Sequence, residues 1–215
     1  MNIEKDIYNF SNKLQKCNES EKKDFTLKYC KANTATLHLI INNVFFKLNL
    51  FNEIEFLFKD DELLSLLSNP LIINSVYYQE PEIVTLFIKY KLVNVSDYKE
   101  PYINKALNLN NIDFLKLIID NVDNFDNMNY HFFTTPIIEE NKEVLRILLE
   151  SEKVFLNSDF LNVLISAFNL NLLDIISWLL DFDKVLDLCS SEWSQKLHDH
   201  KQQKFFSFIL SVKSF

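Results

Sequence analysis

The sequence predicts an all-α fold, an α-solenoid of stacked helix-turn-helix repeats of 30–31 residues. The first observation behind this prediction is an apolar pattern that recurs five times at a nearly constant spacing. The second is a pair of prolines, 31 residues apart, at the predicted starts of two helices. The third is a small side chain at the same place in most repeats. A fixed period between 20 and 50 residues is typical of solenoids, in which each unit buries its apolar face against its neighbours.

The recurring pattern predicts the second helix of each repeat. A polar anchor residue is followed by two apolar residues, one variable residue and three apolar residues, which is typical of a short, deeply buried helix. The anchors and the residues that follow them are Glu82 (IVTLFI), Asp113 (FLKLII), Glu143 (VLRILL), Asp174 (IISWLL) and Lys204 (FFSFIL), with a weaker copy after Asn52 (EIEFLF). The four acidic anchors complement the dipole at a helix N-terminus.

A first helix is predicted before the second helix, at "PLIINSVYYQ", "PYINKALNLN" and "FLNVLISAFNL". Pro70 and Pro101 suit the first turn of these helices, and Pro81 suits the first turn of a second helix, because the N–H that proline lacks needs no partner there. Asn110 and Asn171 lie three residues before their anchors. Asparagine adopts the left-handed conformation more readily than other non-glycine residues, so we expect it to end the first helix.

Small side chains at Ser75, Ala106 and Ala167, seven residues before their anchors, would let paired helices approach closely. Pro136 occupies this place in the third repeat. We expect a shortened or displaced first helix there, beginning at Pro136 and capped by Thr135.

Residues 1–34 lie outside the repeat and are predicted to form an N-terminal helical cap. The segment "IEKDIYNFSNKL" has an amphipathic pattern, and Asn18 and Glu21 have the spacing of a capping box. Residues 35–215 are predicted to form the repeat array, with about five to six repeats, the last acting as the C-terminal cap.

These residues resemble the ankyrin-repeat family, in the divergent form of protist and viral ankyrin arrays. The most recognisable stretch is "VNVSDYKEPYINKALNLNNIDFLKLII", residues 93–119, in which the following positions fall in the family's order: Val93, Asn94, Asp97, Pro101, Ala106, Asp113, Leu117, Ile118 and Ile119. The resemblance covers roughly residues 69–210 and, more faintly, residues 35–68. The family's period of about 33 residues is longer, and its turn glycines and T-P-L-H motif are missing here. Either β-hairpin fingers or tight loops therefore connect the repeats.

Composition removes several classes of function. The 215 residues are 48% hydrophobic and 24% charged, as in an ordinary folded protein, and none is glycine. Without glycine there is no phosphate-binding loop, dinucleotide fingerprint or G-x-S-x-G elbow, so we expect no cofactor. A net charge of −8 gives no basic surface for nucleic acid. We expect no nucleic-acid partner.

The cellular location of the protein is predicted from its cysteines and its hydropathy. Cys17, Cys30 and Cys189 are an odd number at wide spacing, which fits free thiols in a reducing compartment. The first ten residues, "MNIEKDIYNF", lack the pattern of an export signal, and no run of 18 apolar residues would span a membrane. We expect an intracellular, cytoplasmic protein, which would lie in a host cell if it is an effector. We also expect it to be monomeric and to have no membrane partner.

Candidate chemical groups are few. The "HDH" segment at 198–200 suggests a metal site, but residues two apart on a helix diverge, so we expect a solvated face and no metal. No local sequence marks a cysteine as activated. Acid pairs such as Asp60-Asp61 and Glu139-Glu140 fit exposed helix ends. We therefore expect no catalytic residue.

The ankyrin resemblance implies a concave binding face made of the inter-repeat turns and the ends of the first helices. Carried over by position, the partner-binding candidates are Tyr77, Tyr78, Asp97, Tyr98, Asn108, Met128, Tyr130 and Asn169. Tyrosine and methionine suit protein contacts because they bury much area at a modest entropic cost. Each aromatic residue could instead pack between repeats.

Two functional hypotheses follow. The first is a non-enzymatic protein–protein interaction module that acts as an adaptor, an inhibitor or a host-directed effector. The second is an enzyme, or the substrate-recruiting part of one, whose site is not recognisable from sequence. A deep pocket with a perturbed carboxylate or thiol would favour the second, and a shallow tyrosine-lined groove would favour the first.

Overall fold

The chain forms helices and short helical turns, with no β-strand in the part that the structure describes. The computed structural model describes residues 3–48, 50–76, 78–123, 125, 130–193 and 200–213. The predicted all-α class is therefore confirmed. The chain divides into two compact units, unit 1 at Met1–Asn94 and unit 2 at Val95–Phe215.

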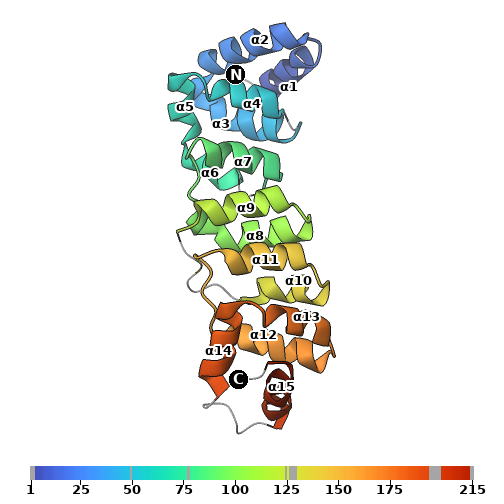
Figure 1. Cartoon of the computed structure of the whole chain (residues 1–215). Coiled ribbons are helices and arrows are strands. Elements are labelled where there is room, and N and C mark those ends of the chain that lie inside the picture. The colour runs from blue at the N-terminus through green and yellow to red at the C-terminus, as the bar shows by residue number, and fades with distance from the viewer. Residues whose placement is uncertain are drawn as a thin grey trace. The chain divides into compact units, whose positions relative to one another are not determined.

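Unit 1 contains seven labelled α-helices in its described part (Figure 1). They are α1 (Ile3–Leu14), α2 (Glu19–Ala32), α3 (Leu37–Ile40), α4 (Phe51–Leu57), α5 (Asp61–Leu67), α6 (Pro70–Val76) and α7 (Pro81–Lys89). A 3₁₀ turn at Thr34–Thr36 precedes α3, and a π-helical segment at Ile41–Phe46 continues it. Helices α6 and α7 begin at Pro70 and Pro81, as predicted.

The first helical pair, α1 and α2, forms as the sequence predicted. The Asn18 side chain accepts a hydrogen bond from the Glu21 N–H at 3.0 Å, and the Glu21 carboxylate accepts one from the Asn18 N–H at 3.2 Å. Phe10 of α1 is 1% exposed and stacks on Tyr29 of α2, with ring centroids 4.0 Å apart. The predicted capping box is confirmed, and stacked aromatic rings join the two helices.

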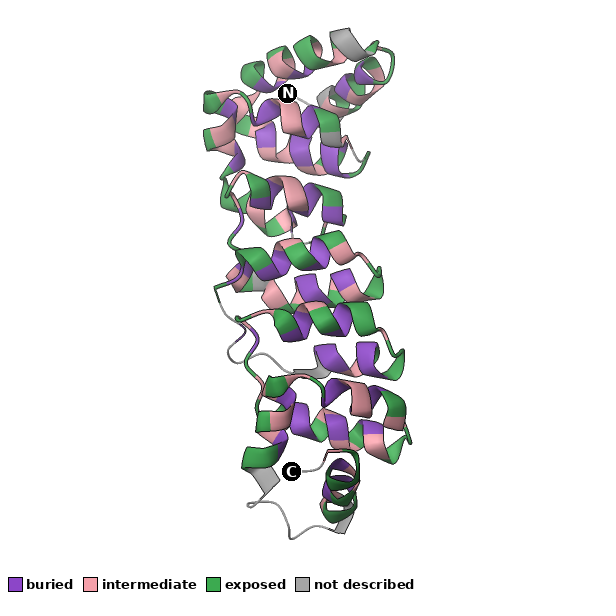
Figure 2. Cartoon of the chain, viewed as in Figure 1, coloured by how far each residue is buried: buried purple, intermediate pink, exposed green. Residues whose placement is uncertain are grey.

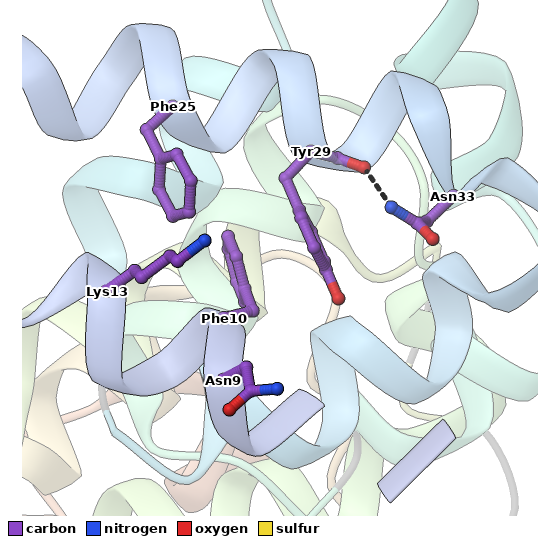
Figure 3. Close-up of a pocket in the computed structure, with 6 residues that line it drawn as sticks. All are labelled: Asn9, Phe10, Lys13, Phe25, Tyr29 and Asn33. Atoms are coloured by element: carbon purple, nitrogen blue, oxygen red, sulfur yellow. Dashed lines mark hydrogen bonds between the residues drawn. The ribbon is translucent and has the colours of Figure 1, made fainter. Parts of the chain in front are cut away.

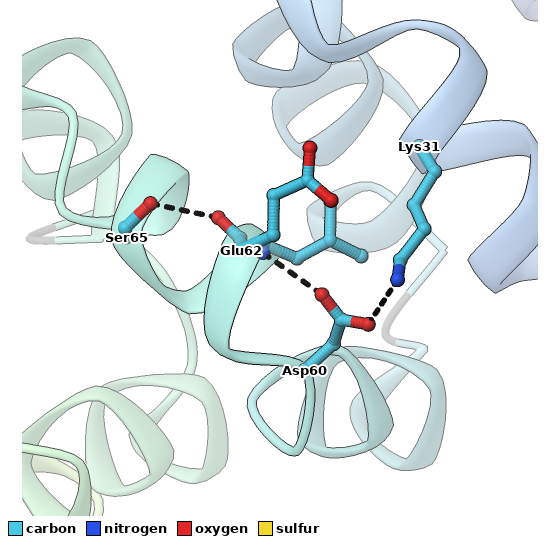
Figure 4. A network of polar contacts seen from close by, with 5 residues as sticks. Lys31, Asp60, Glu62 and Ser65 are labelled. Carbon is cyan, nitrogen blue, oxygen red and sulfur yellow. Dashed lines mark hydrogen bonds and ion pairs between the residues drawn. The ribbon is translucent and has the colours of Figure 1, made fainter.

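An ion pair joins α2 to the start of α5 (Figure 4). The Lys31 ammonium lies 2.5 Å from the Asp60 carboxylate, whose other oxygen accepts from the Leu63 N–H at 3.2 Å. The hydrogen bond from Lys31, followed by that from Leu63, holds the pKa of the Asp60 carboxyl below its usual range. Asp60 therefore stays ionised and caps α5.

Unit 2 contains three successive helical hairpins in its described part, α8–α9, α10–α11 and α12–α13 (Figure 1). Its helices are α8 (Lys99–Asn108), α9 (Ile112–Asn121), α10 (Thr134–Ile138), α11 (Lys142–Glu150), α12 (Ser158–Asn169), α13 (Leu173–Leu179), α14 (Asp183–Trp193) and α15 (His200–Val212). Short 3₁₀ turns at Val95–Tyr98 and Tyr130–Phe133 precede α8 and α10. Helix α9 contacts α11, and α10 contacts α12, so consecutive hairpins are neighbours.

The second helices carry both buried and exposed residues (Figure 2), and the buried ones recur at the same positions after each anchor. The first, second, fifth and sixth residues after Glu82, Asp113, Glu143 and Asp174 are all buried. These positions lie on one face of a helix with 3.6 residues per turn. After the fifth anchor, Lys204, the sixth residue is Leu210, which is 45% exposed. The four acidic anchors lie in the first turns of their helices, as predicted.

A left-handed residue ends the first helix of each hairpin in unit 2. Asn110 has φ 47°, Glu140 has φ 51° and Asn171 has φ 61°. In each case the N–H of the next residue reaches the carbonyl five positions back, at 2.9, 2.8 and 3.1 Å. This hydrogen bond and the positive φ define a Schellman motif, which usually contains glycine. The prediction is confirmed for Asn110 and Asn171, and Glu140 is a third member that was not predicted.

The first helix of the middle hairpin is shortened, as predicted from Pro136, but its predicted cap is wrong. Helix α10 begins at Thr134 and has 5 residues, and Thr135 lies inside it. The residue at the N-cap is Phe133, which makes no side-chain capping bond. The 3₁₀ turn at Tyr130–Phe133 runs directly into α10, so the backbone enters the helix without a capping hydroxyl.

Lysines link the carboxyl ends of successive second helices in unit 2. The Lys153 ammonium donates to the carbonyls of Ile119 at 3.0 Å and Asp120 at 2.7 Å, at the end of α9. The Lys184 ammonium, 31 residues later, donates to the carbonyls of Ser151 at 3.0 Å and Val154 at 3.2 Å, beyond the end of α11. Burial lowers the pKa of the Lys184 amine. Each cation satisfies carbonyls at or beyond a helix C-terminus.

Replacing Lys184 with Met should lower the free energy of unfolding by about 1–2 kcal/mol, because the apolar stem stays while two carbonyls lose a charged donor. Chemical denaturation followed by circular dichroism measures this change. The matched control is Lys116→Met, at an exposed position of α9. Equal stability of the two variants would contradict a linking role for Lys184.

Replacing Leu148 with Asp should lower the free energy of unfolding by about 4 kcal/mol or more, because Leu148 is 0% exposed and the new charge would be buried without a partner. Thermal and denaturant unfolding measure the loss. Leu71→Asp introduces the same charge at a leucine that is 57% exposed, in the first turn of α6, and should leave stability nearly unchanged. Normal stability of Leu148→Asp would disprove the repeat alignment.

Candidate binding surface

Several of the predicted partner-binding residues lie at helix ends and face solvent. Tyr78 follows α6 and is 77% exposed. Asn108 and Asn169 are the last residues of α8 and α12, and both are exposed. Asp97 is exposed in the 3₁₀ turn before α8. These four side chains are accessible to a partner.

The other predicted residues lie wholly or partly outside the described residues. Tyr77 and Met128 are not among the described positions. Tyr98 and Tyr130 belong to 3₁₀ turns, and the description of these two residues covers only the backbone. Their contribution to a binding face stays a prediction.

The predicted face in unit 2 is not one cluster. Asp97 precedes α8 and Asn108 ends it, and a helix of 10 residues is about 15 Å long. The structure therefore places these two candidates at opposite ends of one helix. Asn108 and Asn169 share the end that carries the hairpin turns, whereas Asp97 lies at the end that carries the connections between hairpins.

Sequence reasoning missed a set of exposed apolar side chains beside these turns, which we name the turn row. Leu109 is 53% exposed, Ile138 is 51% exposed and Leu170 is 61% exposed. Leu109 and Leu170 directly precede the left-handed residues of their turns, and Ile138 ends α10. Single exposed apolar residues are common on protein surfaces, but Leu109 and Leu170 recur at one structural position. Ile138 lies one residue earlier in the middle turn, where Glu139 takes that position.

The turns that carry the turn row are neighbours. The Asn141 side-chain amide donates to the Asn110 side-chain oxygen at 3.2 Å, which joins the first turn to the second. The Lys142 ammonium lies 5.6 Å from the ring centroid of Trp178, which joins the second hairpin to the third. In Figure 1 the three turns follow one another along the same edge of unit 2.

The charges beside the turn row are mostly negative. The segments 108–114, 138–144 and 169–175 cover the three turns and contain five acids and one lysine, Lys142. The acids are Asp113, Glu139, Glu140, Glu143 and Asp174, and all five are exposed. The turn row is therefore an apolar strip with an acidic border.

One sequence pattern could have found part of this row. An apolar residue lies four positions before most anchors, as in Leu48, Tyr78, Leu109 and Leu170. A leucine at this position suggests core packing if the first helix is assumed to continue past it. The left-handed residue that follows Leu109 and Leu170 ends the helix and leaves these side chains exposed.

A shallow pocket lies between α1 and α2 in unit 1 (Figure 3). Its volume is about 350 Å³, and its lining residues are Asn9, Phe10, Lys13, Phe25, Tyr29 and Asn33. The Asn33 amide donates to the Tyr29 carbonyl at 2.8 Å. The lining offers rings, amides and one amine, and it contains no carboxylate, thiol or imidazole.

The thiols do not form an activated site in the described part of the chain. Cys30 is 0% exposed and Cys189 is 1% exposed, and burial raises the pKa of each to about 12. The Cys17 sulfur is half-buried and lies 3.3 Å from the Lys13 carbonyl. Buried thiols with raised pKa values are poor nucleophiles because only the thiolate reacts.

The described residues contain neither a metal-binding group nor a membrane-spanning helix. No group of three or more His, Cys, Asp or Glu side chains there could hold a metal ion. Of the "HDH" segment, His198 and Asp199 lie outside the described residues, as does the side chain of His200. No described helix combines the length and the apolar character that crossing a membrane requires.

Comparisons with known proteins identified no relative of this chain. Neither protein-family models nor curated proteins nor solved structures gave a match to this chain.

In the native protein, a thiol reagent applied near pH 8 should modify Cys17 quickly and Cys30 and Cys189 only slowly, because a pKa of about 12 leaves about one thiolate in ten thousand at that pH. The absorbance released by a chromogenic thiol reagent gives the rate of modification, and peptide mapping identifies the modified cysteine. In denaturant all three should react alike. Fast native modification of Cys30 or Cys189 would contradict their burial and revive a thiol-based activity.

Proposed function

We propose that this chain is a non-enzymatic interaction module that binds another protein through exposed surface on its helical hairpins. It would act as an adaptor, an inhibitor or a host-directed effector inside cells. The observation that carries this proposal is the repetition in unit 2, where one hairpin with the same turn occurs three times and presents an exposed apolar side chain each time. A repeated surface suits contact with an extended macromolecular partner.

The hairpins are proposed to belong to an ankyrin-like solenoid. This proposal is supported by the period of 30–31 residues and by the neighbouring contacts of α9 with α11 and of α10 with α12. In place of β-hairpin fingers, 3₁₀ turns precede α8 and α10, and no strand occurs among the described connections. Tight connections between repeats are therefore the better-supported of the two alternatives.

The distribution of chemical groups supports binding over catalysis. The pocket between α1 and α2 lacks a carboxylate and a thiol in its lining, and Cys30 and Cys189 are buried with raised pKa values. Asp60, from one of the acid pairs, is held as a carboxylate that caps α5. Accessible side chains such as Tyr78 instead offer contact area.

Replacing Tyr77, Tyr78 and Tyr98 with Ala should weaken capture of the partner at least tenfold, because truncating central aromatic contacts typically costs more than 1 kcal/mol each. Affinity capture from cell extract, with the intact chain and the triple variant as baits, is read by quantitative mass spectrometry.

The thermal transition of the triple variant is its control. A nearly unchanged transition is expected, because Tyr78 is 77% exposed. A large loss of stability would assign the tyrosines to the core and not to a binding face. Failure of the intact chain to retain any protein above background would count against the interaction role.

A further inference from the structure

We propose that the turn row of unit 2, formed by Leu109, Ile138 and Leu170, is a docking site for a cationic amphipathic helix of a partner protein. This inference rests on the proposed interaction role and names the surface and the chemistry of the partner. The row shares the hairpin-turn end with the predicted candidates Asn108 and Asn169, which directly precede Leu109 and Leu170, and it adds apolar side chains that were not among those candidates.

The apolar part of the site is accessible and repeated. All three side chains are more than half exposed, at 53%, 51% and 61%. The Asn141–Asn110 hydrogen bond joins the first two turns, and the Lys142–Trp178 contact joins the second hairpin to the third. A partner can therefore engage three apolar side chains in sequence without any rearrangement of the backbone.

The spacing of the turns suits a helix. Packed neighbouring helices lie about 8–10 Å apart. Because α9 contacts α11 and α10 contacts α12, we expect successive turns to repeat at about that distance. One heptad of an α-helix advances about 10.5 Å, at 1.5 Å per residue. Apolar residues at every seventh position of a partner helix would each meet one turn.

The sign of the partner's charge follows from the border of the row. Five exposed acids and one lysine lie in the three turn segments, and the ammonium of that lysine, Lys142, lies over the Trp178 ring. The chain as a whole has a net charge of −8. Lysine and arginine beside the apolar positions of the partner helix would complement this border.

Two of the acids occupy places where helix stability does not require them. Glu139 is the C-cap of α10, where a negative charge opposes the helix dipole. Glu140 has φ 51°, a conformation that asparagine adopts in the other two turns and that glutamate disfavours. Both acids project from the middle turn, at the centre of the row, where they are available to a cation.

The test uses the full chain and three synthetic helical peptides of 22 residues. The first carries leucine at every seventh position among lysine and arginine, and the second replaces its basic residues with glutamate. The third keeps the basic composition but places the leucines at irregular positions. Dissociation constants are measured by fluorescence anisotropy at low and moderate salt. We expect the first peptide to bind at least tenfold more tightly than either of the others, and more weakly as salt rises.

Variants then locate the binding. Leu109→Gln, Ile138→Gln and Leu170→Gln together should weaken binding of the first peptide at least tenfold, with circular dichroism verifying the fold. Leu71→Gln and Leu210→Gln change leucines that are 57% and 45% exposed outside the row, and they should change binding less than twofold. The double variant Glu139→Gln and Glu143→Gln alters charge alone, so it still tests the site if the triple variant unfolds. It should weaken binding of the first peptide and reduce the dependence of binding on salt.

Four results would overturn this inference. The first is equal binding of the cationic and anionic peptides, and the second is tight binding that survives both the row and the charge variants. The third is a dimer in sedimentation velocity that the row variant abolishes, which would assign the row to a second copy of the chain. Retention of a protein from extract without binding of the cationic peptide would overturn this inference alone, whereas failure of both would remove the interaction role as well.

Discussion

The arrangement of unit 2 depends on one backbone constraint, which is a left-handed residue between the two helices of each hairpin. Asn110, Glu140 and Asn171 meet this constraint in a chain without glycine. Each conformation costs a non-glycine residue about 1 kcal/mol, and the hydrogen bond of the Schellman motif offsets part of that cost. The reversal it creates brings the buried faces of the paired helices together, so packing stabilises the turn in return.

The same turn separates buried from exposed positions. The second helices α9 and α11 bury four side chains each in the same order after their anchors. On the other side of the turn, the residue before the left-handed position faces solvent, as at Leu109 and Leu170. The local geometry of the turn thus sets which residues are buried and which are exposed, and it leaves a leucine exposed at the same position in the first and third hairpins.

Local features of the fold were predictable, and long-range ones were not. The capping box of Asn18 and Glu21 and the left-handed Asn110 follow from side-chain chemistry within a few residues. Glu140 was missed because glutamate has no preference for that conformation, although its turn forms the same backbone hydrogen bond as the two asparagine turns. The cap assigned to Thr135 failed because a 3₁₀ turn leads into α10.

The candidate site was predicted less well than the fold. Leucines count as core residues in a hydrophobic pattern, so Leu109 and Leu170 did not stand out as surface. Their exposure depends on the exact end of a helix, which is the least certain part of any pattern-based prediction. The contacts of Lys153 and Lys184 join residues 30–34 positions apart, and no local pattern marks their partners.

These lysine contacts bear on how unit 2 loses its structure. Repeat proteins unfold as linked segments whose cooperativity depends on the contacts between neighbours. Lys153 binds carbonyls at the end of α9, and Lys184 binds carbonyls in the segment that carries Lys153. Opening any one hairpin therefore removes a charged donor or its acceptors from the next. Because these lysines connect successive hairpins, we expect local unfolding to spread from one hairpin to the next, with α9 and α11 opening together in hydrogen exchange.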